Sequence, residues 1–309
     1  MRATLIHNPT AGDGKPSRAD IEQIVRAAGF QVRYQSSKKD WKKALKGRSD
    51  LVIVAGGDGT VAKVIRALGD TGRPVAVLPI GTANNIARTV AALGDARELA
   101  DSWRTAKPAP FDVGVAADAG ERHLFVEGAG GGLFAEAIAA GKEHVEDSET
   151  IVGNETDRAL SVMRDIAEKA VARQWRVEID GKDHSGEYLA VEAMNIRHVG
   201  PSVPVAPNAD PGDGRLDVVF VRPSDRRALL DYFDKRLEQH EVKLPRLTVR
   251  RGSQVVLTAS GGRLRVDDRL LENRRRLEIS LMAGATLIVG GAGQSGGGAR
   301  RRKESARAG

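Results

Sequence analysis

The 309-residue chain contains no cysteine, which excludes disulfide bonds, thiolate catalysis and zinc sites built from cysteine. It also has no apolar run that approaches the roughly 18–20 residues of a membrane-spanning helix. The N-terminus leads directly into the strand-like segment Ala3–His7, without the basic start and apolar centre of a secretory signal. We therefore expect a cytoplasmic protein.

The net charge of +7 is unevenly distributed. The last ten residues hold four arginines, one lysine and one glutamate, a local balance of +4, which leaves +3 for the rest of the chain. This charge lies in a Gly/Ser-rich segment that has too few apolar residues to fold, so we expect a disordered tail over 290–309. A weak contact between the tail and an anionic membrane surface is a further option, whereas no feature indicates a specific nucleic acid.

The first 110 residues alternate strand-like and helix-like segments. A continuous apolar run such as Leu51–Ala55 is typical of a strand covered on both faces. Apolar residues at i, i+3, i+4 and i+7 between Ile21 and Ala28 predict an amphipathic helix, and KKDWKKALK predicts a short basic one. The alternation predicts an α/β domain over 1–110, with a parallel sheet and helices on both faces.

Near Phe111 the pattern changes to short strands separated by turn residues, which predicts a β-rich, sandwich-like domain over 111–289. Two helical segments, around Thr156–Ala172 and Arg226–Leu237, interrupt the strands. The glycine-rich run Gly128–Gly132 follows a strand and precedes a helix. We expect it either to line a binding cleft or to form a flexible connection.

Three polar loops that contain glycine follow apolar strands of the first domain: Asn8–Gly12 (NPTAG), Gly56–Thr60 (GGDGT) and Pro79–Asn85 (PIGTANN). In GGDGT, glycines let backbone N–H groups approach an anion, and the following helix adds partial positive charge. An aspartate in such a loop, here Asp58, can hold a magnesium ion or its waters. Because ligands bind at the carboxyl ends of parallel strands, we expect the loops to converge on one site.

The loops match neither the GxxxxGK[ST] phosphate loop nor the GxGxxG fingerprint. Together, however, NPTAG, GGDGT and PIGTANNIAR, in this order, resemble the catalytic family of the diacylglycerol kinases, which is related to sphingosine kinases and more distantly to NAD kinases. The resemblance continues in APNADPGDGRLDVVFV and covers nearly the whole chain apart from the tail. The lead hypothesis is therefore an ATP-dependent kinase that phosphorylates a lipid-like acceptor, diacylglycerol or a related lipid.

The resemblance implies specific roles for several residues. The implied ATP site consists of Asn8, Pro9, Thr10, Ala11, Gly12, Gly56, Gly57, Asp58, Gly59, Thr60, Thr82 and Asn84. The implied Mg²⁺ lies near Asp213, with main-chain oxygens around Asp210 and Arg215, and a water network links it to Asp58. The implied general base is Asp267, because Asp267-Asp268-Arg269 stands where the family has Asp-Gly-Glu. The alternative on the residues alone is that Asp267 and Asp268 simply form a polar hairpin turn.

The chain departs from the family pattern at three places. Ala62-Lys63 replaces Asn-Glu after GGDGT, Asn85 replaces an aspartate in the third motif, and Asp268-Arg269 replaces Gly-Glu. We expect these changes to alter metal dependence or acceptor choice. Two alternatives stay open, a kinase for a soluble polyol or dinucleotide and a catalytically inactive nucleotide-binding regulator. The identity of the acceptor and the oligomeric state are open as well.

Overall fold

The protein is described by a computed structural model that covers residues 1–69, 71–144 and 154–290, so most of the predicted tail lies outside the described residues. The chain divides into two compact units. Unit 1 comprises Met1–Asp112, Pro211–Gly214 and the segment from Ala283; unit 2 comprises Val113–Asp210 and Arg215–Met282. The division is thus not contiguous, unlike the predicted one, because two later segments return to unit 1. None of the described helices has the length and apolar character needed to cross a membrane.

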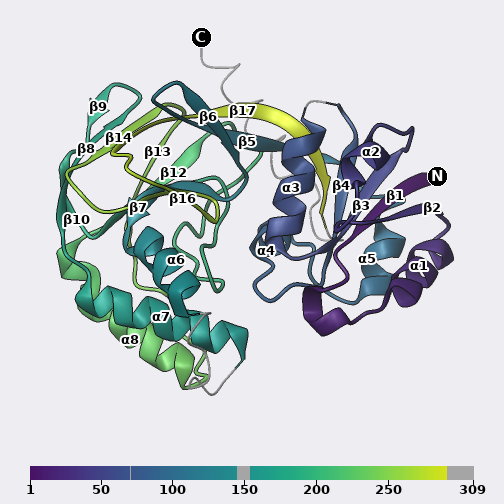
Figure 1. Ribbon diagram of the computed structural model, residues 1–309, viewed down its shortest axis with the longest axis horizontal. Coiled ribbons are helices and arrows are strands. Elements are labelled where there is room, and N and C mark those ends of the chain that lie inside the picture. The colour runs from purple at the N-terminus through teal and green to yellow at the C-terminus, as the bar shows by residue number, and fades with distance from the viewer. Residues whose placement is uncertain (70, 145–153, 291–309) are drawn as a thin grey trace, which may run out of the picture. The chain divides into compact units, whose positions relative to one another are not determined.

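Unit 1 is built on a parallel sheet (Figure 1). Its strands run in the order β2-β1-β3-β4, and the last residues of β17 pair in parallel with β4. The strands are β1 (Arg2–His7), β2 (Gln31–Ser36), β3 (Leu51–Gly56), β4 (Pro74–Pro79) and β17 (Arg276–Val289). All six residues of β3 are buried, as its continuous apolar run predicts.

Helices cover both faces of this sheet. They are α1 (Arg18–Ala27), α2 (Trp41–Leu45), α3 (Asp58–Leu68), α4 (Asn85–Thr89) and α5 (Ala96–Ser102), with a short 3₁₀ turn η1 at Ala11–Gly14. Helices α1 and α5 share one core cluster with alternate residues of β1, β3 and β4. Helix α3 buries its own apolar stripe, which includes Val61 and Ile65, beside β3 and outside that cluster. Since alternate strand residues point to opposite faces, α3 lies on the other face.

Unit 2 consists of two antiparallel sheets with a shared core. The first sheet contains β5 (Ala109–Asp118), β6 (Glu121–Phe125), β8 (Arg173–Ile179), β9 (Lys182–Asp183), β10 (Gly186–Tyr188), β14 (Val255–Ala259) and the first part of β17. The second runs in the order β13 (Thr248–Gly252), β12 (Leu216–Val221), β11 (Ala190–Met194), β7 (Gly128–Gly132), β15 (Leu264–Val266), β16 (Arg269–Leu271). Residues of both sheets, Trp175 and Val191 among them, form one apolar cluster. The predicted β-rich, sandwich-like character is confirmed.

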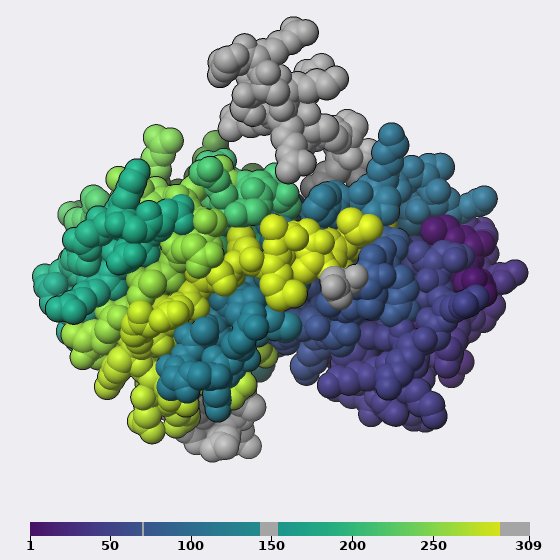
Figure 2. Space-filling model, turned by 90° about the horizontal axis from the view of Figure 1, so that it is seen from above, coloured from purple at the N-terminus to yellow at the C-terminus, as the bar shows by residue number. Residues whose placement is uncertain are grey.

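Three helices pack on the second sheet through a separate cluster that includes Met194, Val219 and Phe233. They are α6 (Leu133–His144), α7 (Glu155–Lys169) and α8 (Arg226–Leu237), with a 3₁₀ turn η2 at Pro223–Asp225 before α8. The middle of β17 is exposed, and its yellow atoms lie on the face that Figure 2 shows.

The glycine-rich run Gly128–Gly132 is neither a flexible connection nor a loop, which corrects the expectation from sequence. It forms β7, a fully buried strand paired on both edges, with β11 and β15. A Cβ atom on Gly130 would overlap the main-chain oxygen of Val191, and one on Gly131 would overlap that of Arg263. The glycines are needed because the backbones approach closely, a reason that composition does not reveal.

Candidate active site

The three glycine-bearing loops lie together at the carboxyl edge of the unit 1 sheet. The strand order reverses between β1 and β3, because β2 pairs on one side of β1 and β3 on the other. The loops after β1 and β3 therefore flank a topological switch point, the usual place for a ligand in an open parallel sheet. The backbone N–H of Asn8 donates to Ala55 O at 2.8 Å, which holds the first loop beside β3.

The third loop packs against both of the others. A Cβ atom on Gly12 would lie 2.6 Å from the main-chain oxygen of Ile80, and one on Gly81 would overlap the Cα of Gly57. Glycine is therefore required where the loops touch, and at Gly12 also by a φ of 60°. In unit 1, the loops NPTAG, GGDGT and PIGTANN therefore lie together, as the sequence predicts.

Asp58 links the second loop to the start of α4. Its Oδ2 accepts a hydrogen bond from Asn85 N at 2.8 Å, and its Oδ1 accepts one from Ile86 N at 2.9 Å. Burial raises the pKa of Asp58, while these two hydrogen bonds and the charge of Arg88 act in the opposite direction. The carboxylate thus caps a helix from another loop, a role that the sequence did not suggest.

Side-chain contacts also hold the third loop in shape. Asn84 has a φ of 52°, its Oδ1 accepts from Gly81 N at 3.0 Å, and its Nδ2 donates to Gly81 O at 2.6 Å. Arg88 donates to Ala83 O at 2.9 Å. Asn84 is therefore engaged in building the loop, whereas Thr82 at its tip is exposed.

An open surface borders the first turn of α3. Gly59 is exposed, with no atom within 4 Å of the position of a Cβ, and Pro9 and Thr10 of the first loop are exposed as well. Asn8 Oδ1 accepts a hydrogen bond from the Thr10 hydroxyl at 3.1 Å. Backbone N–H groups at the start of an eleven-residue helix, with space in front of them, suit an anion such as a phosphate.

The predicted magnesium residues lie in the turn between Asp210 and Arg215. Asp213 is exposed, and the neighbouring Gly214 donates its N–H to Asp112 Oδ2 at 2.8 Å, so buried Asp112 anchors this turn. Among the described residues, no group of three or more His, Cys, Asp or Glu side chains could hold a metal ion. A donor set of one carboxylate, main-chain oxygens and water would consist of oxygen alone, which is the chemistry that Mg²⁺ prefers.

Asp267 lies in unit 2, at the first position of the two-residue turn between β15 and β16, with a φ of 50°. It is only 5% exposed, whereas Asp268 is exposed. Its Oδ1 accepts from Val126 N at 3.1 Å, Glu127 N at 2.9 Å and Gly128 N at 3.4 Å. Asp267 is thus a turn residue and at the same time a buried carboxylate that accepts hydrogen bonds from three main-chain N–H groups.

A buried ion pair contacts the main chain of Asp267. The sequence alone did not reveal it. Arg265 Nη2 is 2.9 Å from Glu192 Oε2, and the two side chains are 2% and 0% exposed. Arg265 Nη1 also donates to the main-chain oxygen of Asp267 at 2.8 Å. Burial raises the pKa of Glu192, and the charge of Arg265 opposes this shift. The available signal was a charged residue at an inward position in each of two apolar strands.

We expect the double variant Glu192→Leu/Arg265→Met to be about as stable as the wild type, because apolar residues often replace a buried ion pair without loss. Arg265→Met alone should lose roughly 3–5 kcal/mol of unfolding free energy, because it leaves the carboxyl group of Glu192 buried without its partner. Urea denaturation of the three proteins measures this. A single variant as stable as the double one would contradict a charged pair.

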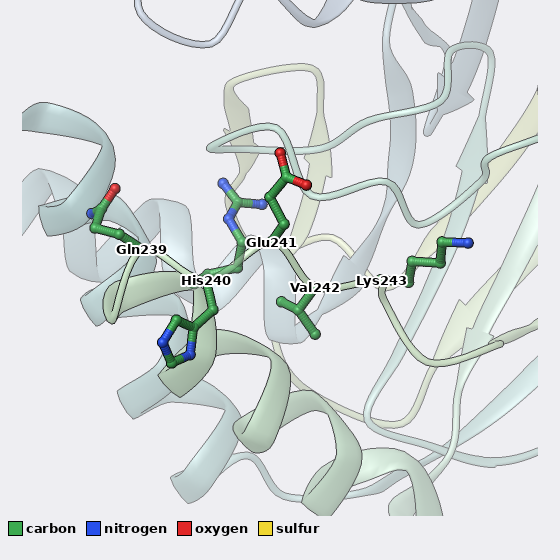
Figure 3. A pocket seen from close by; sticks show the side chains of 6 residues that line it. Gln239, His240, Glu241, Val242 and Lys243 are labelled. Carbon is green, nitrogen blue, oxygen red and sulfur yellow. The ribbon is translucent and has the colours of Figure 1, made fainter.

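A surface hollow in unit 2 is unrelated to these residues. It lies in unit 2 after α8 and has a volume of about 500 Å³. Its lining consists of Arg236, Gln239, His240, Glu241, Val242 and Lys243 (Figure 3). It contains none of the predicted site residues.

Comparison with known proteins relates both parts of the chain to known families. Residues 2–116 match the family model of the diacylglycerol kinase catalytic domain, and residues 137–271 match that of the YegS C-terminal NAD kinase beta sandwich-like domain. A diacylglycerol kinase of Bacillus subtilis is 27% identical over 240 residues, which is 72% of this chain and 75% of that protein. A Pseudomonas aeruginosa protein named probable lipid kinase YegS-like is 30% identical over 231 residues, 72% of each chain.

Solved structures show the same fold. A diacylglycerol kinase structure from Bacillus anthracis superposes with a TM-score of 0.69 at 22% identity, over 93% of this chain and 96% of that one. Yeast NADH kinase complexed with NADH superposes with a TM-score of 0.54 at 11% identity, over 94% and 83% of the two chains. The sequence matches, rather than the fold alone, define the class as lipid kinases. The chain belongs to the diacylglycerol kinase family, in which its relatives include YegS-like lipid kinases.

Proposed function

We propose that the protein transfers the γ-phosphoryl group of ATP to the hydroxyl of diacylglycerol or a related lipid. The observation that carries this proposal is the junction of three glycine-bearing loops at the switch point of the parallel sheet, beside the open first turn of α3. Phosphoryl transfer depends mainly on alignment and on neutralising charge, which such a backbone cradle supplies. The family relationship supports a lipid acceptor.

Each predicted residue has a place in this proposal. Residues Asn8–Gly12, Gly56–Thr60, Thr82 and Asn84 would form the ATP site, with Asp58 and Asn84 shaping it through the loop contacts. Asp213 and the main-chain oxygens of Asp210 and Arg215 would hold Mg²⁺, which neutralises phosphate charge when bound. Asp267 would accept the proton of the acceptor hydroxyl.

The proposal is tested by incubating the purified protein with labelled ATP, Mg²⁺ and separate acceptors. We expect label in a lipid product from diacylglycerol or a related lipid, and none from NAD or a polyol. Label transferred only to NAD would favour a dinucleotide kinase, to which the fold of yeast NADH kinase relates the chain. ATP binding without any transfer would favour the inactive regulator.

A further inference from the structure

One segment of unit 1 concentrates positive charge that the proposed active site does not use. Between residues 37 and 49 the chain carries six cations and a single acid, Asp40. The cations, here named the basic stretch, are Lys38, Lys39, Lys42, Lys43, Lys46 and Arg48, and all six are exposed. The charge of the chain outside its tail is therefore less evenly spread than its small total suggests.

The cations of the basic stretch have no counter-ions of the kind that some other cations of the protein have. Some cations on the longer helices pair with acids four residues away, as Arg18 with Glu22 and Lys235 with Asp231. None of the six side chains forms an ion pair with any residue that the structure describes. Like charges this close repel one another, so an external anion beside the stretch would be favourable.

Helix dipole effects explain little of this composition. Lys42, Lys43 and Lys46 are near the carboxyl end of α2, where a cation is favourable, but the helix has only five residues. Lys38 and Lys39 precede its amino end, where a cation is unfavourable. A folding role therefore does not account for the whole stretch.

The packing of α2 turns the stretch outward and adds an aromatic residue to it. Ala44 and Leu45 are buried, and α2 contacts β1 and β2, so these residues attach the helix to the sheet. Trp41, at the first position of α2, is partly exposed. Tryptophan beside lysines is the composition that favours the interface between lipid headgroups and acyl chains.

The stretch also begins at the edge that carries the candidate nucleotide loops. Ser37 N donates to His7 O at 2.7 Å, so the chain enters the stretch at the carboxyl end of β1, where the loop Asn8–Gly12 starts. We propose that the basic stretch, with Trp41, is a docking surface for a membrane rich in anionic lipid. The choice of a membrane rests on the proposed lipid acceptor, since a kinase for such a substrate must meet it at a bilayer.

Tryptophan fluorescence gives a direct test on the full chain. Of the three tryptophans, Trp103 and Trp175 are buried at 2% exposure each, so a spectral change on binding reports on Trp41. Vesicles of phosphatidylcholine with about a third phosphatidylglycerol should shift the emission to shorter wavelength, and raised salt should reverse the shift. An unchanged spectrum on vesicles that co-sediment with the protein would place the contact elsewhere.

Charge removal with a matched control completes the test. The variant Lys42→Gln/Lys43→Gln/Lys46→Gln should bind these vesicles roughly 100-fold more weakly than the wild type in co-sedimentation. The control Lys169→Gln/Lys182→Gln/Lys243→Gln removes three exposed lysines from unit 2 and should bind like the wild type. Equal losses in both variants would show that only net charge matters and would overturn the proposal.

Two further outcomes separate this inference from the proposed function. A short RNA that binds the wild type more tightly than the vesicles do, and loses binding in the same variant, would assign the stretch to nucleic acid. If the wild type phosphorylates no lipid yet shows the vesicle results above, the docking surface stands and the proposed activity fails. If it phosphorylates detergent-dispersed lipid but does not bind anionic vesicles, the proposed activity stands and the docking surface fails.

Discussion

Replacing Asp267 by asparagine is expected to lower turnover by roughly 10²–10⁴-fold while the dissociation constant of ATP stays within about threefold of the wild type. Asparagine keeps the Oδ1 that accepts the N–H groups of Val126, Glu127 and Gly128, and it replaces only the Oδ2 that accepts a further contact from Val126 N at 3.1 Å. It also tolerates the φ of 50° well. The substitution therefore removes the proton acceptor and keeps the Oδ1 hydrogen bonds that hold the turn, which alanine would not.

Asp268→Asn is the matched control for this experiment. Asp268 is the next residue of the same turn, but its side chain is exposed and the variant should keep nearly all of its turnover. Turnover numbers and ATP dissociation constants are compared for both variants. A crippled Asp268 variant would mean that the family pattern is shifted by one residue in this chain. Normal turnover in both would place the base elsewhere.

The loop architecture was predictable from sequence because it depends on two local properties. An apolar run such as Leu51–Gly56 identifies a buried strand, and in a parallel sheet the carboxyl ends of such strands share one edge. The sequence also shows directly that Gly12 and Gly57 lie in the loops that follow two of these strands. What the pattern could not supply is which atoms touch, since Gly12 meets Ile80, nearly seventy residues away.

Helix boundaries were predictable where propensity and packing agree. The predicted helix Arg226–Leu237 matches α8. The segment that begins at Asn85 forms two short helices, α4 and α5, rather than one long one. The chain between them adopts positive φ at Ala91 and Gly94, which ends the first helix before its third turn. An alanine in that conformation leaves no sign in the sequence.

The ion pair next to Asp267 could not be predicted either, and the reason is a different one. Glu192 and Arg265 are separated by 73 residues and come from two strands that both pair with β7. Each charge alone looks like an exception to an apolar strand, and only the register of the sheet joins them. Long-range register depends on the whole hydrophobic pattern of unit 2 rather than on a motif.

The structure also changes what a substitution of Asp58 should reveal. Asp58→Ala is expected to abolish phosphoryl transfer and, in addition, to lower the free energy of unfolding by about 1–3 kcal/mol. The loss of stability arises because the N–H groups of Asn85 and Ile86 lose their acceptors. An inactive alanine variant would therefore not distinguish a role in the metal–phosphate network from the collapse of the third loop.

Asp58→Asn separates the two roles. Its Oδ1 can still accept from one of the α4 amides, so the variant should lose less stability than alanine, yet turnover should fall at least 100-fold if the negative charge serves Mg²⁺ and phosphate. Asp95→Asn is the matched control, because Asp95 caps α5 through Arg97 N and Glu98 N and belongs to none of the three loops. Turnover, ATP affinity and urea denaturation are measured for both. An active, slightly destabilised Asp58→Asn protein would reduce Asp58 to a helix cap and remove it from the proposed nucleotide site.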